Sequence, residues 1–384
     1  MPSQQICGIK NCFMKKKVLF VIHDLGQGGA EKVLVSLVNN MDRTKFDVSV
    51  CALFGGGVNE QFLEPDIHFR AVFSHEISGN SKLMKLLTPK QLYKLCVRKR
   101  YDIVVSYLEG PSARVVSGCP YHETKLVSWI HVEQHTKEWA VGSFRSFAEA
   151  EGCYNRFDRT ICVSKYVLDD FNAIFKVTHL SEVLYNTVES RVIIEKSREA
   201  ITEVYFNSGE IKLIGIGSLK ETKGFDRLIR IHKRLCEAGL PVHTYILGKG
   251  PERDNLIKQT QDLDVSNTVT LLGYHTNPYK YIAKCDLFVC ASYAEGFSTA
   301  ATEALILGVP VCTVEVSGMK EMLGENNEYG IVVDNDDDAL YNGIKRLLDD
   351  PDLLAHYKRQ AEIRGKCFST EETVRAVEDM LLKL

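Results

Sequence analysis

The stretch Ala294-Glu295-Gly296-Phe297-Ser298-Thr299-Ala300-Ala301-Thr302-Glu303 decides the fold, because it joins an apolar strand to a helix through one glycine. Upstream, residues 287–292 (Leu-Phe-Val-Cys-Ala-Ser) predict a buried parallel strand. Downstream, residues 298–307 predict a helix that stops at Gly308-Val309-Pro310. The stretch therefore predicts one βα unit whose turn is bracketed by two carboxylates.

A helix N-terminus of this kind presents unpaired amides that bind a phosphate or a similar anion. Glu303 lies about 7 Å further along the predicted helix than Ser298, at 1.5 Å per residue. A diphosphate bound to the amides could then carry a polyol at each end, and a hydroxyl group of each polyol could contact one of the two carboxylates. The alternative is that Glu295 is a solvated loop residue and Glu303 a surface residue, and the stretch alone does not separate the two interpretations.

Strands and helices alternate on both sides of this unit. The alternation implies βαβ units with right-handed crossovers and parallel sheets covered by helices on both faces. A chain of 384 residues exceeds the usual size of one hydrophobic core, so we expect two doubly wound domains with ligands in the cleft between them. The predicted strands are residues 18–22, 48–54, 103–106, 126–130 and 160–163, then 211–217, 242–247, 269–272, 287–292, 311–316 and 331–333.

The same pattern suggests where the domains begin and end. Residues 1–13 lack periodicity and form an irregular extension, residues 14–188 form the N-terminal domain, and residues 189–209 connect it to the second domain. Residues 210–366 form the C-terminal domain. Residues 367–384 contain a helix, started by a capping box at Ser369, that could pack back on the N-terminal domain.

Composition excludes several protein classes. No apolar run reaches the roughly 18 residues that cross a bilayer and no signal-peptide pattern opens the chain, so we expect a cytoplasmic protein. The net charge is −3, and we expect no nucleic-acid partner. The chain has 12 cysteines but no C-x-x-C pair, and Cys51, Cys162, Cys290 and Cys312 fall in predicted strands. Buried thiols are therefore favoured over disulfides or a zinc site.

One segment, Lys82 to Arg100, is basic and amphipathic and contains no acidic residue. Such a segment can lie on the anionic inner face of a membrane, where each basic residue contributes on the order of 1 kcal/mol. The alternative is a core helix with a solvated basic face, and the two interpretations are nearly balanced. The basic residues are Lys82, Lys85, Lys90, Lys94, Arg98, Lys99 and Arg100.

Other loops at predicted strand ends carry residues suited to phosphate binding. The glycine-rich turn at residues 26–29 fails the G-x-G-x-x-G spacing, which argues against a nicotinamide cofactor. Lys220 and Lys223 follow the strand at 211–217, and Lys249 follows the next strand. His131 ends the strand at 126–130. Surface lysines and structural histidines are common, so each signal is weak alone.

Glu295 and Glu303 match the E-x7-E motif of the retaining GT-B glycosyltransferases of glycosyltransferase family 4 (group 1), which the chain resembles from about residue 14 to residue 384. The resemblance implies two Rossmann-like, doubly wound domains that face each other across a cleft. Taken together, the motifs look most like those of bacterial enzymes that assemble capsular or exopolysaccharide repeat units. The other matching segments are residues 28–31, 106–110, 129–131, 223–226, 250–252 and 316–321.

The resemblance implies transfer with retention and without a metal or other cofactor. Glu295 would contact the donor hexose, Glu303 would hold the nucleotide ribose, and Lys223 would stabilise the leaving diphosphate. One such electrostatic interaction is worth about 3 kcal/mol. His131 would lie beside the transferred sugar. Further donor contacts are expected from Gly28, Gly29, Ser218, Lys249, Gly296, Phe297, Ser298 and Thr299, and acceptor contacts from Asp24, Leu25 and Tyr107.

The chain departs from the family at Ser218, where the family usually has an arginine that pairs with the lysine on the diphosphate. Lys220 or Lys249 could supply the missing charge, Lys249 being the better placed. The sequence therefore predicts a membrane-associated transferase that moves a hexose from a nucleotide sugar, UDP-linked rather than GDP-linked, to a lipid-linked glycan. A catalytically silent nucleotide- or glycan-binding partner, or another GT-B enzyme such as an epimerase or a phosphorylase, are the alternatives.

Overall fold

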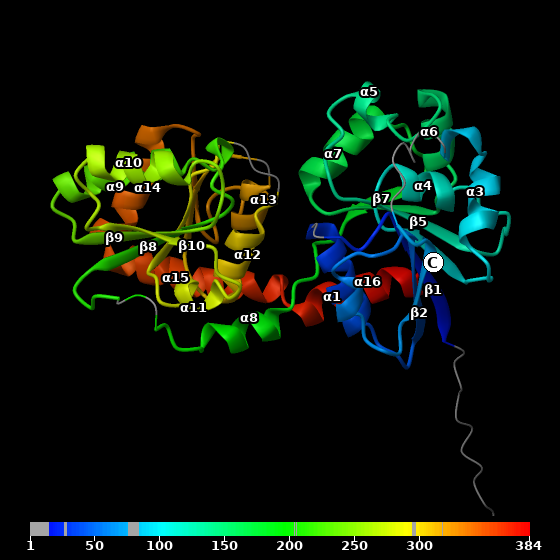
Figure 1. The fold of residues 1–384 in the computed structure, drawn as a ribbon, viewed down its shortest axis with the longest axis horizontal. Helices are drawn as coiled ribbons and strands as arrows, with labels where there is room; N and C mark the ends of the chain where they lie inside the picture. Colours follow the sequence, from blue (N-terminus) through cyan, green and yellow to red (C-terminus); the bar gives the residue numbers. More distant parts are fainter. Residues whose placement is uncertain are drawn as a thin grey trace, which may run out of the picture. The chain divides into compact units, whose positions relative to one another are not determined.

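The computed structural model describes residues 15–26, 29–75, 84–202, 204, 206–293, 297–316 and 318–384. The chain forms two compact units (Figure 1). Unit 1 contains the residues up to Cys162, Asp170–Glu182 and Arg375–Leu384, and unit 2 contains Val163–Asp169 and Val183–Val374. Among the residues singled out above, Gly28, Lys82, Glu295 and Gly296 lie outside the described residues.

Unit 1 is built on a seven-stranded sheet of order β3-β2-β1-β4-β5-β6-β7, with parallel pairing from β3 to β6. The chain moves outward from β1 to β3 and then in the other direction from β4, so the order reverses between β1 and β4. The strands are β1 (Lys16–Ile22), β2 (Phe46–Phe54), β3 (His68–Phe73), β4 (Ile103–Ser106), β5 (Lys125–Ile130), β6 (Arg159–Cys162) and β7 (Leu180–Val183).

Helices fill the connections of unit 1. Strand β1 is buried from Val18 to Ile22, as expected of a central parallel strand covered on both faces. The helices are α1 (Gly29–Asn40), the short η1 (Glu60–Phe62), α3 (Pro89–Cys96), α4 (Pro111–Val116), α5 (Lys137–Ala140), α6 (Phe147–Tyr154) and α7 (Lys165–Ile174). The residues of α7 up to Asp169 belong to unit 2.

Unit 2 repeats the plan with a six-stranded parallel sheet of order β10-β9-β8-β11-β12-β13, which reverses between β8 and β11. Helices α9, α10 and α14 cover one face, and α8, α11, α12 and α15 the other (Figure 1). The strands are β8 (Ile211–Ile216), β9 (Val242–Leu247), β10 (Val269–Gly273), β11 (Leu287–Cys290), β12 (Val311–Val314) and β13 (Ile331–Val333). The helices are α8 (Ser190–Ser197), η2 (Glu221–Lys223), α9 (Phe225–Glu237), α10 (Arg253–Asp262), α11 (Tyr279–Ile282), α12 (Thr299–Ile306), α13 (Met319–Leu323), α14 (Asp337–Asp349), α15 (Pro351–Cys367) and α16 (Thr370–Leu382).

The predicted fold class, two Rossmann-like parallel sheets with helices, is confirmed, but two strands were missed. Strands β3 and β7 lie at the edges of the first sheet and are only partly buried. They lack the continuous apolar run that marks a central strand. Cys51, Cys162, Cys290 and Cys312 are buried free thiols, as their positions in predicted strands indicated.

The segment at residues 189–209, predicted to be a weakly patterned connection, contains α8, and Ile193 of this helix belongs to the core of unit 2. At the other end of the chain, α16 begins in unit 2, and from Arg375 onward its residues belong to unit 1. In unit 1 the Lys16 ammonium donates to the carbonyl of Leu381 at 3.1 Å, and the amide of Asp42 donates to the buried carboxylate of Glu378.

The basic segment is divided by Thr88, which caps α3 through a capping box with Gln91. Helix α3 buries Leu92 and Tyr93 in the core, as the core-helix alternative expected. By contrast, the side chains of Leu86 and Leu95 lie outside the core: Leu86 is 74% exposed and Leu95 is 43% exposed. No helix within the described residues is both long and apolar enough to cross a membrane.

Candidate functional site

In unit 2 the loop after β8 holds Lys223 against the backbone of Gly217. The aliphatic carbons of Lys223 pass 3.5–3.6 Å from the point where a Cβ on Gly217 would stand. The Lys223 amide donates to the carbonyl of Lys220 at 3.0 Å, which closes the short helix η2. The half-buried Lys223 side chain therefore packs beside the carboxyl end of β8.

The loops that follow β8, β9 and β10 are locked together by backbone hydrogen bonds. The Leu219 amide donates to the carbonyl of Lys249 at 2.9 Å, and the Glu252 amide donates to the carbonyl of Leu219 at 3.0 Å. The Gly248 amide donates to the carbonyl of Gly273 at 2.9 Å. A Cβ on Gly248 would overlap the carbonyl oxygen of Gly217, so only glycine permits this approach. Three strand ends therefore form one rigid loop cluster.

Gly224 ends this loop in the left-handed region, at φ 62°, where α9 begins. A Cβ there would overlap the carbonyl oxygen of Ala291, which lies just beyond β11. The loop of Lys223 and the end of β11 are thus in direct backbone contact.

We expect Gly224→Ala to destabilise unit 2 by about 3 kcal/mol, because an unfavourable φ and a backbone overlap add together. Gly239→Ala is the matched control: Gly239 has a φ of 82° but open space around it. It should cost only about 1 kcal/mol. Thermal unfolding followed by circular dichroism measures both changes, and equal losses would contradict the packing argument.

Helix α12 carries the second group of predicted donor residues. The Ser298 hydroxyl caps the helix by accepting from the Ala301 amide at 3.3 Å. The Phe297 ring stacks on Tyr185 at 5.7 Å and meets Phe368 edge-on at 6.0 Å. That side chain is therefore structural, which leaves the Phe297 backbone for a ligand. Thr299 is exposed.

Glu303 lies one turn further along α12 and is half-buried. The Tyr279 hydroxyl of α11 donates to its Oε1 at 3.4 Å. Burial, together with the nearby Glu303 carboxylate, raises the pKa of Tyr279. Tyr279 could not be predicted as a partner of Glu303, since nothing in its local sequence links it to a residue 24 positions away.

Lys220 and Lys249 are the two lysines predicted to supply the positive charge that Ser218 lacks. Ser218 is exposed, as is Lys220. The Lys249 ammonium lies 4.8 Å from the centre of the Tyr274 ring, a cation–π contact with the loop after β10. Lys249 therefore belongs to the same loop cluster as Lys223 but already has a partner.

In unit 1 the predicted residues follow β1, β4 and β5, which are neighbours in the sheet. The Asp24 carboxylate pairs with His23 Nδ1 at 2.6 Å and accepts from the Gly26 amide at 2.6 Å. Leu25 is fully buried, so only its backbone could serve a ligand. Gly29 is the first residue of α1, and a Cβ there would meet open space.

His131 follows β5 and is packed on Tyr107, with ring centres 4.8 Å apart. Tyr107 is itself only 1% exposed, so it supports His131 and cannot form a free acceptor surface. The His131 amide donates to Glu109 Oε2 at 3.0 Å, and its Nε2 has no hydrogen-bond partner among the described residues. Burial lowers the pKa of His131 to about 3 and raises the pKa of Glu109. The imidazole is therefore neutral near pH 7.

This neutral histidine predicts a pH-dependent loss of stability. Its folded-state pKa lies below the unfolded value of about 6.5, so below that pH the unfolded chain binds more protons and stability falls. Relative to His131→Gln, which keeps the backbone contact to Glu109, the wild type should lose about 2 kcal/mol between pH 7 and pH 5.

Urea unfolding followed by tryptophan fluorescence measures this loss, since Trp129 and Trp139 are the two tryptophans of the chain and both belong to unit 1. A stability difference between wild type and variant that does not change with pH would show that His131 titrates normally in the folded state.

The structure thus brings the predicted residues together as two sets, each at the point where the strand order of its sheet reverses. Open α/β sheets bind their ligands at such points. The sets are Ser218, Lys223, Lys249, Phe297, Ser298, Thr299 and Glu303 in unit 2, and Asp24, Leu25, Gly29, Tyr107 and His131 in unit 1.

Two Rossmann-like units of this kind are typical of GT-B glycosyltransferases, and the comparisons with known proteins support that class. Residues 197–364 match the family described as glycosyl transferases group 1, and residues 27–191 match glycosyltransferase family 4. Together the two matches cover most of the chain, and with the relative described next they show that the chain belongs to the group 1 (family 4) glycosyltransferases. This chain is 30% identical, over 373 residues, to the N-acetylgalactosamine-N,N'-diacetylbacillosaminyl-diphospho-undecaprenol 4-alpha-N-acetylgalactosaminyltransferase of Campylobacter jejuni. The match covers 94% of this chain and 98% of that relative.

Other similarities agree with this assignment. The lipopolysaccharide core biosynthesis glycosyltransferase LpsD of Rhizobium meliloti is 23% identical over 375 residues, which are 94% of this chain and 96% of that protein. Among solved structures, HepE of Anabaena in complex with UDP and glucose has a TM-score of 0.70 at 20% identity, covering 96% of this chain and 100% of that one. Sucrose-phosphate synthase of Thermosynechococcus elongatus has a TM-score of 0.72 at 14% identity, covering 96% and 99%. At these identities the two structures support the fold.

Proposed function

We propose that this glycosyltransferase moves a hexose, with retention of configuration, from a UDP-linked sugar to a lipid-linked glycan in bacterial cell-surface polysaccharide synthesis. The observation that carries the proposal is the packing of Lys223 beside Gly217, within a loop cluster that shares the sheet edge of unit 2 with α12 and Glu303. A cation and a carboxylate on neighbouring βα units suit the two ends of a nucleotide diphosphate.

In this proposal each donor residue has one task. Lys223 neutralises the charge that develops on the departing diphosphate, the Phe297 and Ser298 region of α12 contributes backbone amides, and Glu303 holds the ribose. Glu295, from the same motif, contacts the hexose. Neutral His131 offers its backbone or its ring to the transferred sugar without adding a positive charge beside the developing oxocarbenium ion.

The relatives support the acceptor class. The Campylobacter protein is named for an undecaprenyl-diphosphate acceptor and an α linkage, and the Rhizobium protein for lipopolysaccharide core synthesis. An α product is what retention gives from an α-linked donor. The Anabaena structure holds UDP, whereas a Mycobacterium tuberculosis relative is named for GDP-mannose, so both nucleotides belong in any test.

The proposal includes attachment to the cytoplasmic face of the membrane through residues 82–100. The exposed Leu86 and Leu95 are its apolar contacts, and Lys90 and Lys94 on α3 are among its cationic ones. Vesicles with and without anionic lipid distinguish charge-driven binding from apolar binding, because the electrostatic part is screened by salt.

The direct test offers the purified chain UDP-glucose, UDP-galactose, UDP-N-acetylglucosamine, UDP-N-acetylgalactosamine and GDP-mannose together with an undecaprenyl-diphosphate-linked glycan. We expect transfer from one UDP-sugar and an α-linked product by NMR. Absence of both transfer and slow donor hydrolysis with every donor would falsify the proposal. Transfer with inversion would remove its retaining mechanism alone.

A catalytically silent nucleotide-binding partner is the second candidate, favoured by the exposed Ser218 where the family usually has arginine and by the pairing of Lys249 with Tyr274. It predicts nucleotide binding without turnover for every donor and acceptor. The same assay therefore separates the two functions.

A further inference from the structure

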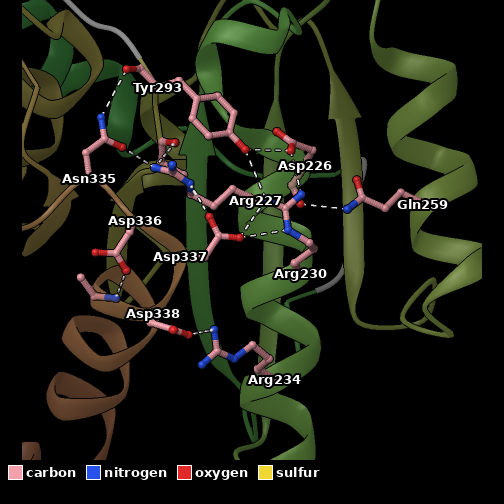
Figure 2. Close-up of polar contacts among 12 residues, drawn as sticks. Asp226, Arg227, Arg230, Arg234, Gln259, Tyr293, Asn335, Asp336, Asp337 and Asp338 are labelled. Atoms are coloured by element: carbon pink, nitrogen blue, oxygen red, sulfur yellow. Dashed lines mark hydrogen bonds and ion pairs between the residues drawn. The ribbon is translucent and has the colours of Figure 1, made fainter.

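Tyr293 has all three of its polar groups bonded, although 38% of its surface is exposed (Figure 2). Its amide donates to the carbonyl of Thr222 at 2.9 Å. Its own carbonyl accepts from the Asn335 side chain at 3.3 Å, and its hydroxyl donates to Asp226 Oδ2 at 2.9 Å. The residue is therefore fixed at the backbone and at the far end of the ring.

Arg227 fixes the face of the same ring. Its guanidinium lies 4.1 Å from the ring centre and is only 3% exposed. Nε donates to Asp337 at 2.9 Å and Nη1 to the Asn335 side chain at 2.8 Å. A buried charge needs such partners. Here they are Asn335, in the loop that precedes α14, and Asp337, the first residue of α14.

Arg230, one turn further along α9, closes the network (Figure 2). It donates to the Tyr293 hydroxyl at 3.2 Å, to Asp226 at 2.8 Å and to Asp337 at 2.8 Å. We call Asp226, Arg227, Arg230, Asp337 and Asn335 the Tyr293 clamp. Two arginines and two aspartates balance in charge, and the planar guanidinium groups set the direction of each bond.

Tyr293 itself connects the loop of Lys223 with the chain that follows β11. Thr222, which accepts from the Tyr293 amide, immediately precedes Lys223, and the carbonyl of Ala291 lies against Gly224. In sequence, Tyr293 immediately precedes Ala294-Glu295-Gly296, and the chain is anchored again at Phe297 by its aromatic contacts.

We propose that Tyr293, held by this clamp, is a positioning residue for glycosyl transfer that fixes the loop of Lys223 relative to the end of β11. This inference rests on the proposed function, but its structural part does not require turnover. Positioning within a fraction of an ångström matters because a displacement of about 1 Å can cost about 100-fold in rate.

The main test variant is Tyr293→Phe, which removes the hydroxyl and keeps the ring under Arg227. We expect the backbone amides of Lys223, Gly224 and Tyr293 to exchange with solvent about tenfold faster in the free protein, because local opening becomes easier. In the transfer assay we expect kcat to fall about tenfold or more while the donor KM stays within about twofold.

Asp338→Asn is the matched control. Asp338 pairs with Arg234 at 2.8 Å on the same two helices, α9 and α14, but touches neither Tyr293 nor the clamp in any contact we observe among the described residues. It should leave exchange and kcat unchanged. Arg230→Lys is a second variant that keeps the charge and loses the fork of hydrogen bonds, and it should reproduce the effect of Tyr293→Phe.

Wild-type exchange at these three amides in both Tyr293→Phe and Arg230→Lys would overturn the inference even if the proposed function holds. A lowered melting temperature with unchanged exchange and kcat would also overturn it, since that result indicates a purely structural role. If the wild type transfers no sugar, the proposed function fails, and the exchange experiment still decides whether Tyr293 holds the loop.

Discussion

Lys223→Ala is expected to lower kcat by about 100- to 1,000-fold, the usual effect of removing one preorganised charge or donor from a developing anion. The aliphatic part of its side chain packs beside Gly217, which limits the positions open to its ammonium group. Donor affinity should change much less, because the diphosphate gains most of its extra charge only as the bond breaks.

Steady-state kinetics with the identified donor measure this effect. Lys258→Ala is the control, since Lys258 is an exposed lysine of unit 2 on α10 and carries the same charge. An equal loss in both variants would indicate a general effect of positive charge. An unchanged kcat in Lys223→Ala would contradict the assigned role.

Glu303→Gln is expected to weaken nucleotide binding by about 10- to 100-fold, because a charged acceptor contributes roughly 1.5–3 kcal/mol per hydrogen bond. The substitution keeps the shape of the side chain and its position on α12, so the fold should not change. At saturating donor, kcat should fall less than it does in Lys223→Ala.

Titration calorimetry with UDP and with 2′-deoxy and 3′-deoxy UDP tests whether the lost contact is with the ribose. The loss caused by Glu303→Gln should shrink for an analogue that lacks the contacted hydroxyl. The same loss for all three nucleotides would place Glu303 elsewhere. Tyr279→Phe removes only the long 3.4 Å bond to Glu303 and should have a small effect.

Much of the fold could be predicted because the central strands are short, apolar and buried on both faces. Strands β4, β9 and β13 were predicted with the bounds observed, and β8 and β11 with one end shifted. The edge strands β3 and β7 escaped prediction because half-exposed strands carry mixed residues. Helix α8 was not predicted for a similar reason, since only Ile193 and Ser190 of its eight residues are buried.

The site divides in the same way. Residues such as Lys223 and His131 could be predicted because parallel strands bring their carboxyl ends to one edge. The burial of Leu25 and Tyr107 could not be predicted, since an apolar residue after a strand can face either a ligand or the core. The Tyr279 contact and the Tyr293 clamp depend on residues 24 to 110 positions apart, which local patterns do not connect.

Binding of nucleotide sugars to the purified chain tests most directly whether unit 2 holds the donor. In a thermal-shift screen of UDP-, GDP-, ADP- and dTDP-sugars, a donor at 100 times its dissociation constant should stabilise the fold by about 2.7 kcal/mol. We predict that stabilisation for a UDP-sugar in the wild type and a clear reduction of it in Glu303→Gln at the same ligand concentration. No stabilisation by any of these donors, or an equal shift in the variant, would contradict the donor site proposed here.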